Sequence, residues 1–124
     1  MGFFDHLGLP VLDCEASRDW YRSTLGLEIE FEALERRTVA LRDAKDFALF
    51  LYESRDDRIG SVGIWYQVAD VEAAYVGLRE SGIDFVHEPK STPWGYGAEL
   101  RDPNGYRIYL WDEVTMKANQ AGAT

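Results

Sequence analysis

The chain has 124 residues, of which 46% are hydrophobic and 14% aromatic, which is typical of one globular domain and excludes a disordered or fibrous chain. A formal net charge of −9, with Lys and Arg scattered among acidic residues, argues against a nucleic-acid-binding protein. Cys14 is the one cysteine, no apolar run approaches the ~20 residues of a membrane span, and no signal-peptide pattern opens the chain, so we expect a cytoplasmic protein with neither nucleic-acid nor membrane partners.

The first half of the chain contains one helical pattern among four strand patterns. Asp13 can cap a helix over residues 15–25, and Gly26 can end it. Alternation of apolar and polar residues predicts strands over residues 4–11, 27–32, 37–42 and 46–53. This half therefore has the order strand, helix, strand, strand, strand.

The second half repeats this order. Asp13-Cys14-Glu15-Ala16 recurs as Asp70-Val71-Glu72-Ala73, a shift of 57 positions (70 − 13). We expect strands over 60–68 and 83–88, a helix over 71–81 and a loop-like break over 89–94. The repeat predicts one domain over residues 1–114, with module one at 1–56 and module two at 57–114. Residues 115–124 lack apolar periodicity and should form a flexible tail.

A hairpin closes the second module. Asp102-Pro103-Asn104-Gly105 has the residues of a type I turn that leads into a bulged hairpin. After the turn, three apolar residues alternate with three residues that carry a guanidinium, a phenol and an indole. The first set, Tyr106, Ile108 and Leu110, should face the core, and the second, Arg107, Tyr109 and Trp111, should face outward.

Three motifs together resemble the vicinal oxygen chelate (VOC) superfamily. They are residues 5–11 (DHLGLPV), Trp20-Tyr21 before Leu25-Gly26-Leu27, and the Asp102–Gly105 turn before an alternating strand. That superfamily includes glyoxalase I, extradiol dioxygenases, fosfomycin-resistance enzymes and metal-free bleomycin-resistance binders. The resemblance implies an α+β fold of two βαβββ modules whose curved mixed sheets form a cleft, often completed by a second subunit.

The resemblance also locates four positions where metal-dependent relatives place ligands. In this chain they are His6, Gly63, Phe50 and Tyr109. A catalytic metal needs three or four N, O or S donors, but Gly63 and Phe50 have none and Tyr109 could bind only after losing its phenolic proton. We therefore expect no bound metal, no other cofactor and no catalytic residue at these positions.

Aromatic residues occupy the same predicted face as these four positions. Flat rings can stack on planar ligands, and this favours a ligand cavity for the set, although packing in a core or dimer interface is the alternative for any single ring. The expected ligand-binding residues are His6, Phe50, Tyr52, Trp65, Gln67, Trp94, Tyr96, Arg107, Tyr109 and Trp111.

Pro93-Trp94-Gly95, followed by Arg101-Asp102-Pro103, resembles the bleomycin-resistance branch most. The resemblance implies a metal-independent homodimer that sequesters an aromatic or planar, antibiotic-like molecule. A cationic guest is one option, with Glu28, Glu30, Glu32 and Glu99 as candidate partners, but a solvated edge strand explains the first three better.

The alternative function is that of an enzyme. A glyoxalase-like lyase or a dioxygenase would need displaced metal ligands, for which Glu53, His87 and Glu99 are available. A metal-free isomerase could use His6 and Tyr109 as its acid and base.

Overall fold

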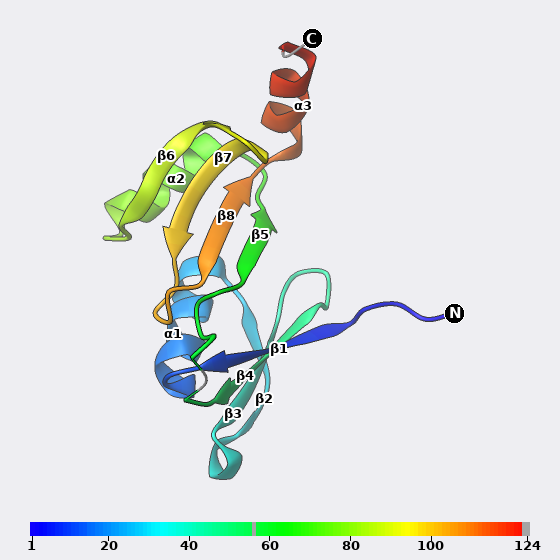
Figure 1. Ribbon diagram of the computed structural model, residues 1–124, viewed down its shortest axis with the longest axis vertical. Helices are drawn as coiled ribbons and strands as arrows, with labels where there is room; N and C mark the ends of the chain where they lie inside the picture. Colours follow the sequence, from blue (N-terminus) through cyan, green and yellow to red (C-terminus); the bar gives the residue numbers. More distant parts are fainter. Residues whose placement is uncertain (56, 123–124) are drawn as a thin grey trace. The chain divides into compact units, whose positions relative to one another are not determined.

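A computed structural model describes residues 1–55 and 57–122 (Figure 1). The chain folds into two compact units. Unit 1 consists of Met1–Gly60 and the turn Asp102–Gly105, and unit 2 consists of Ser61–Arg101 and the chain from Tyr106 onward. None of the helices in the described residues is long and apolar enough to cross a membrane.

Unit 1 contains a four-stranded mixed sheet. Its elements are β1 (His6–Val11), α1 (Cys14–Leu25), β2 (Glu28–Ala33), the 3₁₀ helix η1 (Leu34–Arg36), β3 (Thr38–Arg42) and β4 (Ala48–Glu53). The strand order is β1-β4-β3-β2, in which β1 runs parallel to β4 and the other pairs are antiparallel. Helix α1 packs against β2, β3 and β4.

Unit 2 has the same topology and one additional helix. Its elements are β5 (Gly63–Gln67), α2 (Val71–Glu80), β6 (Phe85–Thr92), β7 (Gly95–Arg101), β8 (Arg107–Trp111) and α3 (Glu113–Gly122). The strand order β5-β8-β7-β6 repeats that of unit 1, and Figure 1 shows α2 on one face of this sheet. The predicted α+β fold of two βαβββ modules is confirmed.

The apolar side chains predicted from the alternation lie on the helix-covered faces. Fully buried residues of the sheet in unit 1 are Leu9, Val11, Val39, Leu41 and Leu51. Those of unit 2 are Ala98, Leu100, Ile108 and Leu110, and Tyr106, just before β8, is also fully buried. Each module thus buries one face of its sheet against its own helix, as period-two strands with one apolar face require.

The helix caps follow the repeat. The Asp13 carboxylate accepts hydrogen bonds from the backbone N–H groups of Glu15 and Ala16, and Asp70 accepts one from Ala73. A second acid caps each helix from the end of the last strand: Glu53 accepts from the N–H of Cys14 at 3.0 Å, and Asp112 accepts from that of Val71 at 2.6 Å. The second pair of caps was not predicted from the sequence.

The Asp102–Gly105 turn forms as predicted. The N–H of Gly105 donates to the carbonyl of Asp102 at 3.1 Å, and Gly105 has a positive φ of 89°. The corresponding turn of module one is Asp43–Asp46, in which the N–H of Asp46 donates to the carbonyl of Asp43 at 3.1 Å. Asp46 also has a positive φ, 64°, so an aspartate takes the conformation that favours glycine.

Strand β6 is longer than predicted. We expected a strand over 83–88 and a break over 89–94, but β6 continues through Pro89 to Thr92. Proline lacks an N–H, and it is accommodated here because β6 is an edge strand whose register shifts between His87 and Lys90.

The end of the chain also differs from the expected flexible tail. Residues Glu113–Gly122 form α3, and residues 123–124 lie outside the described residues. Asp112 accepts hydrogen bonds from the backbone N–H of Thr115 at 2.6 Å and from its hydroxyl at 3.0 Å. Glu113 forms an ion pair with Lys117 at 2.8 Å. These local polar contacts stabilise a helix that has little apolar periodicity.

Phe31 lies on the face opposite to that expected from the alternation of β2. The register shifts between Ile29, which pairs with Leu41, and Phe31, which pairs with Ala40. This bulge places Phe31 on the uncovered face of the sheet, where its ring contacts Phe50 at a centroid distance of 5.4 Å.

Candidate functional site

The face of the unit 2 sheet that α2 leaves uncovered carries the candidate site. Directly paired residues of neighbouring strands share a face, so the register gives the rows of side chains. The central row runs from Trp65 on β5 to Tyr109 on β8, Glu99 on β7 and His87 on β6. Its residues come from every strand of the sheet, so a ligand on this face would contact several strands at once.

Three rings on this face form what we call the aromatic cluster, namely Trp65, Trp94 and Tyr109. The ring centroids of Trp65 and Tyr109 are 4.5 Å apart with an interplanar angle of 31°. Trp94 lies 5.3 Å from Tyr109 and stands edge-on to Trp65 at 6.1 Å. Tyr109 is 6% exposed, whereas Trp65 is 52% exposed. Tyr109 is thus buried within the cluster, whereas the Trp65 ring is available to a ligand.

Two glycines make room for these rings. A Cβ atom on Gly63 would lie 3.0 Å from Tyr109 Cε2 and 3.4 Å from Trp65 Cζ3. A Cβ atom on Gly97 would lie against the carbonyl oxygen of Leu110 and 2.5 Å from Trp94 Cη2. Both glycines therefore serve the close approach of an indole or phenol ring to the sheet.

Charged groups lie beside the aromatic cluster. Arg107 is exposed, and its guanidinium carbon lies 5.9 Å from the centroid of the Tyr109 ring. Arg101 pairs directly with Arg107 across β7 and β8 and forms an ion pair with Glu99 at 2.9 Å. The cluster therefore has a polar edge made of two guanidinium groups and one carboxylate.

Trp111 and Gln67 are the remaining predicted residues on this face. They pair with each other across β5 and β8, one row beyond Trp65 and Tyr109. Trp111 is half-buried and Gln67 is exposed. They extend the face past the aromatic cluster.

The predicted residues His6, Phe50 and Tyr52 lie in unit 1. The rings of His6 and Phe50 are 4.6 Å apart, and Nδ1 of His6 lies 2.8 Å from the Asp5 carboxylate. Tyr52 is exposed, and its ring lies 3.5 Å from where a Cβ atom of Gly8 would be. With Phe31, these side chains form a second aromatic surface, on the uncovered face of the unit 1 sheet.

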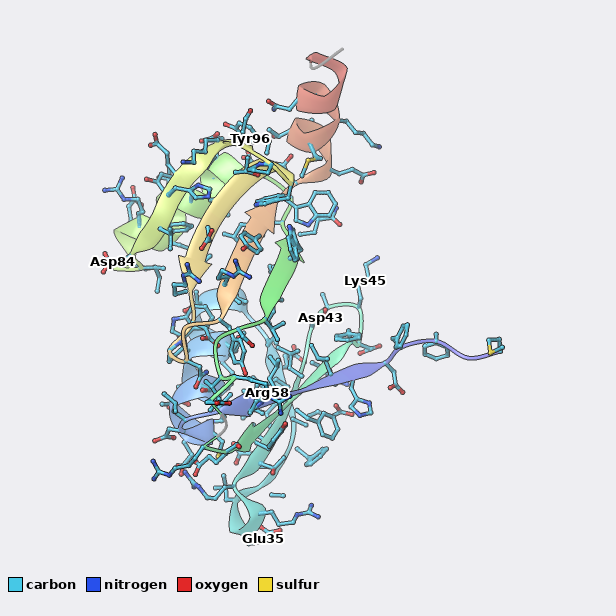
Figure 2. The ribbon with its side chains drawn as sticks, viewed as in Figure 1. Glu35, Asp43, Lys45, Arg58, Asp84 and Tyr96 are labelled. Carbon is cyan, nitrogen blue, oxygen red and sulfur yellow. The ribbon has the colours of Figure 1, made fainter. Side chains whose placement is uncertain are left out.

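Tyr96 does not belong with the aromatic cluster. Its hydroxyl donates to the carboxylate of Glu72 on α2 at 2.9 Å, so its side chain lies on the helix-covered face (Figure 2). This hydrogen bond, with burial, raises the pKa of Tyr96. Tyr96, which the sequence placed among the ligand-binding residues, thus lies on the opposite face of the sheet from Trp65 and Tyr109, because it shares the strand parity of the buried Ala98.

Arg101 was missed in the sequence, and Glu99 was considered there only as a metal ligand or a partner for a cation. The available signal was the Asp102–Gly105 turn. Counting outward from such a turn pairs Arg101 with Arg107 and Glu99 with Tyr109, which is the register observed.

The residues at the family's metal positions do not fit a metal ion. Gly63 offers no donor, and a donor side chain in its place would meet the ring of Tyr109. Within residues 1–55 and 57–122, no group of three or more His, Cys, Asp or Glu side chains is arranged to hold a metal. Burial, followed by the hydrogen bond to Glu53, raises the pKa of the Cys14 thiol to about 11, which disfavours a reactive thiolate.

Several solved structures are similar to this chain over nearly its whole length. TnmS3, an antibiotic binding protein from Streptomyces sp. CB03234, is 27% identical over 90% of this chain and 96% of its own, with a TM-score of 0.76. UcmS2 is 26% identical over 89% and 97%, with a TM-score of 0.74. A superfamily member from Sphaerobacter thermophilus DSM 20745 is 25% identical over 91% and 98%, with a TM-score of 0.76. No match was found among curated proteins.

The family assignment rests on sequence and structure together. The sequence model of the Glyoxalase/Bleomycin resistance protein/Dioxygenase superfamily matches residues 3–110, which include almost all of both modules. The duplicated β1-β4-β3-β2 topology agrees with this match. The resemblance inferred from the sequence motifs is therefore confirmed, and the chain belongs to the Glyoxalase/Bleomycin resistance protein/Dioxygenase superfamily.

Proposed function

We propose that this chain is a metal-independent small-molecule-binding protein that holds a planar aromatic ligand against the aromatic cluster of unit 2. The observation that carries the proposal is the half-exposed Trp65 ring, supported from below by Tyr109 and from the side by Trp94. A ring fixed in this way offers a large contact area at a small cost in side-chain entropy.

The relatives support binding as the function. TnmS3 is an antibiotic binding protein, and it matches this chain over nearly the full length of both. The poor fit of the four family positions to a metal ion supports binding without a metal. We accordingly place an aromatic or planar, antibiotic-like molecule on this face.

The proposal can be tested by energy transfer from tryptophan to 1-pyrenemethanol, a neutral planar probe. We expect saturable transfer, and the Trp65→Ala variant should bind the probe about 5- to 150-fold more weakly, which corresponds to about 1 to 3 kcal/mol for an aromatic contact. Titrations monitored by pyrene fluorescence would keep the comparison independent of the lost indole.

Trp20→Phe is the matched control, because Trp20 lies on α1 in unit 1 and packs edge-on against Tyr21 at 4.9 Å. Its affinity for the probe should equal that of the wild type. Equal affinities for the wild type and the Trp65→Ala variant, with both folded by circular dichroism, would show that the site lies elsewhere.

We also propose that the protein acts as a homodimer. Support comes from apolar side chains that remain exposed in unit 1, namely Phe3, Phe4, Phe31 and Tyr52. Exposed apolar surface of this kind is common where a second subunit packs. Light scattering during gel filtration should give twice the chain mass of 14.2 kDa, and a mass of one chain at micromolar concentration would contradict the proposal.

A further inference from the structure

The charges beside the aromatic cluster differ in sign from the charge of the whole chain. The chain carries a formal net charge of −9. The uncovered face of the unit 2 sheet nevertheless presents Arg101 and Arg107 next to each other, with Glu99 as the acid in the adjacent row. Lys90 pairs with Gly97 and thus adds another cation to this face. The local surplus of positive charge would attract an anion.

Arg107 is a cation that lies over the Tyr109 ring of the aromatic cluster. The Glu99 carboxylate is held by Arg101 at 2.9 Å, and its side chain is 13% exposed. Among the residues that the structure describes, no carboxylate lies within ion-pair distance of Arg107, whose guanidinium rests near the ring of Tyr109 at 5.9 Å. Like charges directly opposite each other on neighbouring strands reduce stability, so the Arg101–Arg107 pair has a cost that folding does not explain.

The position of this guanidinium relative to the rings suits one kind of molecule. Arg107, Tyr109 and Trp65 lie on one face of two adjacent strands. The guanidinium carbon of Arg107 is 5.9 Å from the centroid of the Tyr109 ring. A planar guanidinium pairs with a carboxylate through two parallel hydrogen bonds. A ligand stacked on Trp65 would thus bring an acidic substituent on its ring to Arg107.

We propose that the ligand is a planar aromatic anion, whose ring stacks on the aromatic cluster and whose carboxylate, or a similar acidic group, pairs with Arg107. This inference rests on the proposed function and specifies its ligand class. It replaces the cationic guest considered from the sequence, because Glu28, Glu30 and Glu32 lie on β2 of unit 1 and not on this face. The fourth candidate, Glu99, is paired with Arg101.

Three probes with one ring system and different charges test the inference. They are 1-pyrenecarboxylate, 1-pyrenemethanol and 1-pyrenemethylammonium, titrated at pH 7 into the 124-residue chain. We expect the carboxylate to bind at least about tenfold more tightly than the alcohol. A hydrogen bond between the ionised carboxylate and the guanidinium is stronger than one from the guanidinium to a neutral hydroxyl. This preference should shrink between 0.05 and 0.5 M NaCl, because salt screens the pair.

The Arg107→Gln variant should lose the preference for the carboxylate while its affinity for the alcohol changes less than about twofold, since the stacking surface is retained. Arg107→Lys should keep part of the preference, because lysine retains the charge without the paired donors. Arg79→Gln is the matched control. The Arg79 guanidinium also lies beside a tyrosine ring, that of Tyr75 at 5.5 Å, but on α2. It should bind all three probes as the wild type does.

The outcomes separate this inference from the proposed function. Equal binding of the carboxylate and the alcohol, or tightest binding of the ammonium probe, overturns the anionic ligand while leaving an aromatic binding site. A preference for the carboxylate that persists in Arg107→Gln overturns the role of Arg107. Failure of all three probes to bind overturns the proposed function itself.

Discussion

The two modules use the same strand positions for different side chains on their uncovered faces. In module one the first strand presents His6 and then Gly8, whereas module two presents Gly63 and then Trp65 at the positions 57 residues later (63 − 6 and 65 − 8). In both, the ring from the first strand contacts the ring at the centre of the last, His6 with Phe50 and Trp65 with Tyr109. Both modules thus contain a ring contact at this place, with the positions of ring and glycine exchanged.

The modules also differ in how their helices bind a turn. In unit 1, the Tyr21 hydroxyl donates to the buried Asp102 carboxylate at 2.7 Å, and the Asn104 amide donates to the Ser17 hydroxyl at 3.0 Å. Positions 57 residues after Ser17 and Tyr21 are Ala74 and Leu78 (17 + 57 and 21 + 57), whose side chains carry no polar group. The side chains through which α1 binds its turn are therefore not repeated at the matching positions of α2.

The first, and largest, predicted effect concerns this docking. Tyr21→Phe should lower the free energy of unfolding by about 1 to 3 kcal/mol, because the buried Asp102 carboxylate loses a hydrogen-bond donor. Urea titration measures the change. Tyr75→Phe is the control, since the Tyr75 hydroxyl accepts an exposed hydrogen bond from Arg79 four residues away and should contribute little. Equal changes in the two variants would remove the distinction between the modules.

The second prediction tests the exchange of ring and glycine. Gly63→Ala should destabilise the protein by about 1 kcal/mol and weaken probe binding, because the new methyl group meets the buried Tyr109 ring at 3.0 Å. Gly8→Ala is the counterpart in module one, where the nearest atom is 3.5 Å away, on the exposed Tyr52. It should be neutral or slightly stabilising. A stable Gly63→Ala variant with unchanged binding would show that this glycine does not support the rings.

The third and smallest predicted effect concerns Glu53, the acid at the end of β4 that caps α1, and how it makes stability depend on pH. The hydrogen bond from Arg37, followed by that from the Cys14 N–H, lowers the pKa of Glu53 from 4.5 to about 2. Because the folded-state pKa is the lower one, this contribution to stability is present above about pH 4.5 and is lost as the pH falls through about 2. Glu53→Gln should therefore flatten the dependence of the urea midpoint on pH between about 2 and 4.5.

Glu35→Gln provides the comparison for that measurement. Glu35 is exposed on η1 and lies 3.9 Å from its neighbour Arg36, so its loss should leave the acid dependence of the wild type. Asp112, the cap of the second module, accepts hydrogen bonds from Val71 and Thr115 that lower its pKa although burial acts to raise it. If Glu53→Gln retained the full wild-type slope, Asp112 would be the first group to test in its place.

Most of the fold could be predicted from the sequence, because it depends on local signals. The Asp13 and Asp70 caps, the glycine after α1, the alternation of β3, β4 and β8 and the Asp102–Gly105 turn each act within a few residues. For that reason the two modules, their order and the family could be inferred without coordinates. The parity of Trp65, Arg107 and Tyr109 followed for the same reason, because period two leaves a side chain only two faces.

Tertiary structure decided the properties that depend on pairing between strands. The bulge in β2 moved Phe31 to the uncovered face, the shift in β6 accommodated Pro89, and the register of β7 with β8 set Arg101 opposite Arg107. The tertiary structure also showed that the rings of Trp65 and Tyr109 pack against Gly63. It showed that the Tyr96 hydroxyl donates a hydrogen bond to Glu72 on α2. A one-residue bulge reverses the face of every residue beyond it, and its cause lies in packing across the sheet, which composition and periodicity do not encode.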